Sequence, residues 1–201
     1  MTCRPLLSSP AVCDSAGPAN SPQAGAGRHS AIGQTMNVTQ YRHRLIIMRH
    51  AKAGELPGGP DFERALKARG RRDSTSAGKW LQTNGLQPDA VICSAARRTR
   101  QTWQYLSAEL SGQPSFSSER ALYQADSDDV IDMVKQTAEG VATLLYIGHN
   151  PAASGVVGIL TGTEPEFPTS AIAVLGVNEY WAHLTAGDGE LLASWTPHEV
   201  A

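Results

Sequence analysis

Three short apolar runs, each followed by polar residues and then by a segment with helical spacing, constrain the fold of this chain most strongly. The runs lie at residues 44–49, 90–93 and 143–148. Apolar runs of this length, bounded by turn residues, are typical of strands buried on both faces. Apolar residues three or four positions apart predict helices at about 67–84, 96–111, 126–138 and 150–160. The alternation predicts an α/β fold: a three-layer α/β/α sandwich with a mostly parallel central sheet.

The other segments predict shorter elements. Strands are expected at 170–176, 181–184 and 191–195, the last two antiparallel around a turn, and a short strand at 120–123. Residues 53–66 contain several glycines and prolines and are expected to form a loop at the rim of any site. Polar connectors are expected at 112–118 and 162–168. Gly70 and Gly78 are unfavourable in the interior of the predicted helix at 67–84.

Residues 1–42 are rich in Ser, Ala, Gly and Pro and show no strand or helix periodicity. Such a segment buries too little apolar surface to offset the entropy of ordering. We therefore predict a disordered tail at 1–42 and one domain at 43–201. Met36 stands near the end of the tail, and a translation start there is a hypothesis that the intact mass of the native protein would test.

Charge and composition exclude several classes of protein. A net charge of -2 gives no bulk reason to expect nucleic acid or an anionic membrane as partner. No apolar run approaches the roughly eighteen residues of a membrane span, and the N-terminus lacks the apolar segment of a signal peptide. The three cysteines do not form a disulfide framework, because two of them lie in the tail. We expect a cytoplasmic monomer.

The three apolar runs end in residues that can bind and attack a phosphoryl group. Arg49-His50 ends the first, Ser94 through Arg98 follows the second, and His149-Asn150 ends the third. Ligands of open α/β sheets bind past the carboxyl ends of the strands. Arginine presents a rigid fork of donors to phosphate oxygens, and two histidines allow one nucleophile and one group that stabilises charge.

Each group also has a purely structural explanation. Ser94 suits the cap of the helix that follows it, and Asn150 with Pro151 suits the start of another helix. An Arg-His pair by itself is more often incidental than catalytic. The combination at three strand ends favours a phosphate site.

The combination resembles the histidine phosphatase superfamily, whose members are phosphoglycerate mutase-like. The resemblance rests on Arg49-His50-Ala51, on Ser94-x-x-x-Arg98-x-x-Gln101-Thr102 and on Gly148-His149-Asn150-Pro151, and it extends from about residue 44 to 197. Together with Leu122-Tyr123-x-Ala125 and then Asp129, the pattern is most similar to the SixA-type phosphohistidine phosphatase branch.

The resemblance implies roles for individual residues. His50 would be the nucleophile and carry the phosphoryl group as a phosphohistidine. Arg49 and Arg98 would bind the phosphate oxygens, and His149 would donate to the phosphoryl group in the transition state. Asn150 is a further phosphate-binding candidate that its capping role also explains. A shift of one residue in the helix would give the role of Arg98 to Arg97.

The chain departs from the family pattern at three places. Ala95 stands where proline is frequent, and Ala51 where glycine is common. Members that cleave alkyl phosphate esters tend to carry a glutamate where this chain has Gln124. An alkoxide leaves poorly without a proton, and the loss of a general acid costs roughly two to four powers of ten in rate. The imidazole of phosphohistidine leaves more easily, so the missing glutamate points to an N–P bond.

Other functions remain open on the sequence alone. Glu119, Asp126 or Asp128 could replace the missing acid in a small-molecule phosphomonoesterase, although the aspartates also suit the start of a helix. A non-catalytic phosphate-binding protein is the second alternative. We expect the partner to be a phosphorylated protein or a small phosphorylated compound. No cluster of residues has metal-ligand spacing, so neither a metal nor a cofactor is expected. Asp61 and Arg64, in the rim loop, are expected to contact a protein substrate or only each other.

Overall fold

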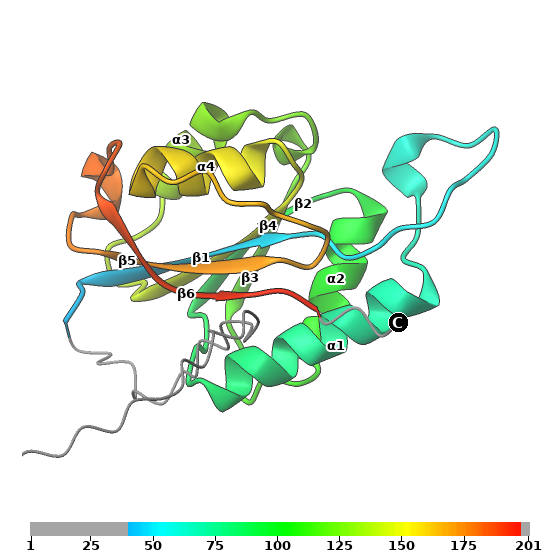
Figure 1. Ribbon diagram of the computed structural model, residues 1–201, viewed down its shortest axis with the longest axis horizontal. Helices are drawn as coiled ribbons and strands as arrows, with labels where there is room; N and C mark the ends of the chain where they lie inside the picture. Colours follow the sequence, from blue (N-terminus) through cyan, green and yellow to red (C-terminus); the bar gives the residue numbers. More distant parts are fainter. Residues whose placement is uncertain (1–39, 198–201) are drawn as a thin grey trace, which may run out of the picture. The chain divides into compact units, whose positions relative to one another are not determined.

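The computed structural model describes residues 40–197, and the tail predicted at 1–42 lies almost wholly outside this range (Figure 1). A six-stranded sheet has the order β3-β2-β4-β1-β5-β6. Its strands are β1 (His43–Arg49), β2 (Ala90–Ser94), β3 (Ser115–Glu119), β4 (Thr143–Gly148), β5 (Ile172–Val177) and β6 (Gly189–Trp195). The first four pair in parallel, whereas β5 is antiparallel to both β1 and β6. The predicted, mostly parallel sheet is confirmed.

Helices cover both faces of the sheet, as the three-layer prediction requires (Figure 1). On one face lie α1 (Ala68–Thr83) and α2 (Arg97–Ser107), whose buried leucines pack with alternate residues of β1, β2 and β4. On the other lie α3 (Ser127–Lys135) and α4 (Ala152–Thr161), packed with the remaining residues of β1, β4 and β5. Strands β4 and β5 are buried along their whole length, which explains their continuous apolar sequences. No helix within residues 40–197 has the length and apolar character to cross a membrane.

The register of the parallel strands aligns the three strand ends. Arg49 of β1 pairs with Gly148 of β4, and Cys93 of β2 pairs with Ile147 of β4. His50 and His149 are therefore the next residues on two adjacent strands. Ser94 follows Cys93 on the other side of β4. Parallel pairing thus brings three segments that are distant in the sequence to one edge of the sheet.

Three predicted elements were wrong. Residues 115–119 form the edge strand β3, not a connector, because pairing with β2 defines this strand while most of its side chains are exposed. The strand predicted at 120–123 is a 3₁₀ helix, η2 (Ala121–Tyr123). The strand predicted at 181–184 is another, η3 (Trp181–His183), held by one fully buried side chain: the Trp181 indole donates to the Val141 carbonyl (2.9 Å).

The two glycines of α1 have a packing role that offsets their poor helix propensity. A Cβ on Gly78 would lie 2.3 Å from the Leu106 carbonyl oxygen of α2. A Cβ on Gly70 would lie 2.3 Å from the carbonyl oxygen of Lys52. The helix can approach its neighbours this closely because both positions lack a side chain.

We predict that Gly78→Ala destabilises the protein by about 1–3 kcal/mol, because the added methyl forces α1 and α2 apart. On helix propensity alone the same change would stabilise an exposed helix by up to about 1 kcal/mol. Urea denaturation of the two proteins measures the difference. Ser76→Ala, at an exposed position of the same helix, is the control and should change stability little. A stabilised Gly78→Ala protein would contradict the close contact.

Candidate functional site

His50 lies just beyond β1 and is held by its backbone and its ring. Its N–H donates to the Gly148 carbonyl (2.9 Å), and its carbonyl accepts from the Ser170 N–H (3.2 Å). The ring Nδ1 lies 2.8 Å from the Ala51 carbonyl oxygen. A carbonyl can only accept, so Nδ1 carries the hydrogen and Nε2 keeps its lone pair. Burial lowers the pKa of His50 to about 3, so the ring is neutral near pH 7.

His149 lies beside His50, with ring centroids 5.1 Å apart. Its Nε2 is hydrogen-bonded to the Ser94 hydroxyl at 2.9 Å. Its Nδ1 is buried and has no hydrogen-bond partner among the described residues. Burial, and after it the charge of Arg98, lowers the pKa of His149 to about 4. The site therefore holds two neutral imidazoles, each with one ring nitrogen fixed by the protein.

Two guanidinium groups complete the arrangement. Arg49 Nη1 donates to the Phe167 carbonyl (2.9 Å), and Arg98 Nη1 donates to the Asp61 carbonyl (2.8 Å). The Nε of each arginine is buried without a hydrogen-bond partner within residues 40–197. Leaving a buried donor unpaired costs about 1–3 kcal/mol, and a bound oxyanion would remove that cost. The charges of both arginines contribute to the lowered pKa of His50.

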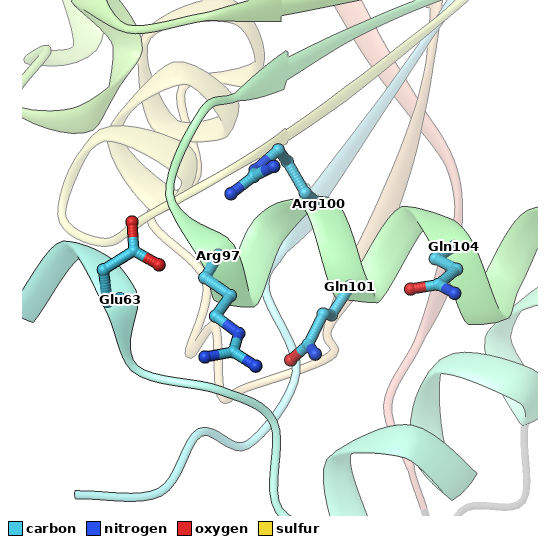
Figure 2. A pocket seen from close by; sticks show the side chains of 5 residues that line it. All are labelled: Glu63, Arg97, Arg100, Gln101 and Gln104. Atoms are coloured by element: carbon cyan, nitrogen blue, oxygen red, sulfur yellow. The ribbon is translucent and has the colours of Figure 1, made fainter. Parts of the chain in front are cut away.

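Arg98, not Arg97, approaches the histidines. Arg98 is buried on the inner face of α2, whereas Arg97 is exposed. Arg97 lines a separate surface pocket of about 240 Å³ next to Glu63, Arg100, Gln101 and Gln104 (Figure 2). The burial of Arg98 therefore favours Arg98, and not Arg97, as the residue that would bind the phosphate.

The structural roles predicted for Ser94 and Asn150 were wrong. The N-cap of α2 is Ala96, and the Ser94 hydroxyl reaches His149 instead. The N-cap of α4 is Pro151, which follows Asn150 through a cis peptide bond. The Asn150 amide donates to the Phe167 carbonyl (3.0 Å), the same oxygen that holds Arg49. Both side chains are used in the site and neither caps a helix.

Asp61, which the sequence predicted to contact only Arg64 or a protein substrate, also contacts Arg98 of the site. It begins η1 (Asp61–Glu63), in a rim loop closed by a bridge between Ala53 and Leu66. One carboxylate oxygen pairs with Arg64 (2.7 Å). The other lies 3.0 Å from Arg98 Nη2 and accepts from the Tyr123 hydroxyl (2.7 Å). The expected Asp61–Arg64 contact is confirmed, but no local pattern could reveal that the loop folds onto Arg98.

The carboxylates considered as acids have other roles. Asp126 caps α3 in a reciprocal pair with Asp129, as its position at a helix start suggested. Glu119 accepts a hydrogen bond from Ser117, and Asp128 is exposed in the first turn of α3. Within residues 40–197, no three His, Cys, Asp or Glu side chains are grouped so that they could hold a metal ion.

Known proteins resemble this chain in sequence and in fold. An uncharacterized protein of Mycobacterium leprae (strain TN) is 39% identical over 164 residues, which cover 75% of this chain and 99% of that protein. A protein of Nakamurella multipartitia, described as a candidate phosphohistidine phosphatase SixA, has a similar structure, with a TM-score of 0.69 and 29% identity over 79% of this chain and 97% of that one. The protein histidine phosphatase SixA complexed with tungstate is also similar, with a TM-score of 0.66 and 28% identity over 75% of this chain and 95% of that one.

Residues 45–146 match the sequence model that describes branch 1 of the histidine phosphatase superfamily. The match covers the ends of β1 and β2, with Arg49, His50, Ser94 and Arg98. His149 lies three residues beyond the matched range, on the strand that pairs with β1. The chain therefore belongs to the histidine phosphatase superfamily, branch 1, and has its phosphoglycerate mutase-like fold.

Proposed function

We propose that this protein is a metal-independent phosphohistidine phosphatase that uses His50 as its nucleophile. The observation that carries the proposal is the state of His50: a neutral ring with its Nδ1 hydrogen fixed on the Ala51 carbonyl and a lone pair on Nε2. A buried neutral imidazole between two guanidinium groups is suited to attack a phosphoryl group. The likeness to SixA structures at 28% and 29% identity supports the choice of substrate.

The reaction takes place in two steps. Arg49 and Arg98 bind the phosphoryl oxygens, and the lone pair of His50 Nε2 attacks phosphorus. The P–N bond of the substrate breaks, and its electron pair returns to the leaving imidazole nitrogen. Water then attacks the phosphorus of the phosphorylated His50 and loses a proton to the solvent. The electron pair of the second P–N bond returns to Nε2, and inorganic phosphate leaves.

Ser94 is placed to set the tautomer of His149. Its hydroxyl lies 2.9 Å from His149 Nε2 and 3.5 Å from the Ala96 nitrogen, and we infer that it accepts from the Ala96 N–H and donates its hydrogen to Nε2. When Nε2 accepts this hydrogen, Nδ1 must carry the ring hydrogen. The buried Nδ1–H then has no partner within residues 40–197 and can donate to a phosphoryl oxygen as charge develops there.

Three carboxylates within residues 40–197 that an ester-cleaving enzyme could use as its acid are engaged elsewhere or held ionised. Asp126 is engaged in the cap of α3, and Glu119 is bonded to Ser117. Asp61 is near the site, but its hydrogen bonds with Arg64 and Tyr123 hold the pKa of this carboxyl well below its usual range. An ionised carboxylate cannot protonate an alkoxide. Cleavage of an N–P bond depends less on a general acid, so phosphohistidine is the favoured substrate.

His50→Ala should reduce phosphohistidine hydrolysis by about three powers of ten or more, because no other group replaces the nucleophile. The wild-type protein, quenched during turnover, should carry acid-labile, alkali-stable phosphate that the variant lacks. Radiolabelled phosphohistidine peptide measures both quantities. His183→Ala removes an exposed histidine of η3 and should leave the rate unchanged. Near-normal hydrolysis by His50→Ala would refute the mechanism, and so would phosphate binding without turnover by the wild type.

Ser94→Ala should lower kcat by about 10- to 100-fold with little effect on KM, because the tautomer of His149 is no longer fixed. Steady-state kinetics on the same peptide separate the two constants. Ser74→Ala is the matched control, since its buried hydroxyl bonds only to the Gly70 carbonyl within α1. Equal losses of kcat in Ser94→Ala and Ser74→Ala would show that the Ser94 hydroxyl matters only for packing.

Neither His50 nor His149 should titrate between pH 8 and about pH 5, because burial lowers their pKa values to about 3 and about 4. An unshifted histidine would gain its proton near pH 6.5. NMR spectra of protein with ¹³C-labelled histidine, assigned through the His50→Ala and His149→Ala variants, measure the ring shifts. A ring that titrates near pH 6.5 would show that the site is open to water. The depressed pKa values favour the folded state above about pH 6.5, and this contribution is lost as the pH falls towards 3–4.

A further inference from the structure

The rim loop forms a wall of the site that carries the carboxylate of Asp61. It is 48% exposed, whereas the Arg98 side chain that it contacts is 8% exposed. The two groups lie 3.0 Å apart. A phosphoryl group bound to Arg98 would therefore lie close to a carboxylate that borders solvent.

Asp61 is linked through Tyr123 to the part of the site that holds His149. The Tyr123 ring lies between Asp61 and His149, donating to the first and contacting the second edge-on at 5.8 Å. In a phosphoryl transfer the nucleophile and the leaving group are in line on opposite sides of phosphorus. With His50 as nucleophile, the leaving group would lie on the far side of phosphorus from His50, and we place it beside Asp61.

The surroundings keep Asp61 ionised and in place. Arg64 holds one carboxylate oxygen and is itself tied to the Gly54 carbonyl (2.7 Å). The hydrogen bond to Asp61 raises the pKa of Tyr123, so the phenol remains a donor. Without the carboxylate, Arg64 and Arg98 would leave this wall strongly positive.

We propose that Asp61 is the specificity-determining residue of this site, selecting substrates whose phosphoryl group is carried on a cationic nitrogen base and rejecting those with an anionic leaving group. The inference rests on the proposed function and names its substrate class. A carboxylate stabilises a nearby imidazolium. When the phosphorylated imidazole holds a proton on its second nitrogen, the P–N electron pair returns to the first nitrogen. The ring then departs neutral, and no acid has to deliver a proton.

The test removes the negative charge of Asp61 and keeps the shape of its side chain. Asp61→Asn retains an oxygen acceptor for Arg98, and Glu63→Gln, in the same 3₁₀ helix, is the matched control. Glu63 lines the surface pocket beside Arg97 (Figure 2). Two phosphate esters serve as probes: phosphocholine, with a cationic leaving group, and 3-phosphoglycerate, with an anionic one. Phosphohistidine peptide is measured in parallel.

The ratio of kcat/KM for phosphocholine to that for 3-phosphoglycerate should fall by about tenfold in Asp61→Asn and stay unchanged in Glu63→Gln. A unit charge roughly 7 Å away acts with opposite sign on the two leaving groups, which gives a change of this size. The change should shrink at 1 M salt because exposed charges are screened. Calorimetry measures the affinities of the same variants for the same two probes. The ratio of these affinities tests the charge effect even for a protein that hydrolyses neither ester.

The outcomes separate the two hypotheses. A ratio that changes less than twofold, or equally in both variants, overturns the role of Asp61 even if the wild type hydrolyses phosphohistidine. A wild type that leaves phosphohistidine intact refutes the proposed function, and the ester ratio still decides whether Asp61 selects by charge. An equal loss on all substrates in Asp61→Asn would assign Asp61 only to holding Arg98.

Discussion

The parallel pairing of β1 with β4 is the constraint on which the site depends. The pairing of Arg49 with Gly148 makes His50 and His149 neighbours, and the backbone bond from His50 to Gly148 holds them there. A slip of one residue would turn every side chain of a strand to the opposite face. Because β1 and β4 are buried in both apolar layers, such a slip would also expose the core. The packing of the sheet and the geometry of the site are thus fixed by the same register.

Burial determines the protonation state of the two histidines in the site. The rings of His50 and His149 lose water, and desolvation lowers both pKa values, so both rings are uncharged at neutral pH. The same burial leaves the Nε groups of Arg49 and Arg98 unpaired among the described residues, at a cost in stability. A site that binds an oxyanion recovers this cost only when it is occupied. The rim loop contributes the opposite charge, since Asp61 offsets Arg98 at the edge.

Strands and helices with strong apolar patterns could be predicted, and those defined by single contacts could not. The edge strand β3 has a polar sequence because it faces solvent, so only its pairing with β2 identifies it. The 3₁₀ helix η3 depends on one buried indole, which leaves no periodic signal. Asp61 is similar: nothing near it in the sequence indicates a contact with Arg98, 37 residues away.

The sequence by itself determined the layered α/β fold and the residues that end β1, β2 and β4, because burial and strand order leave direct traces in the apolar pattern. The family followed from the resemblance of the three motifs at those strand ends. Only the tertiary structure decided what those residues do to one another. It selected Arg98 over Arg97 by burying one face of α2, turned Ser94 from a helix cap into a partner of His149, and brought Asp61 to the rim. Local sequence encodes local geometry, whereas hydrogen bonds between distant segments exist only after the strands have paired.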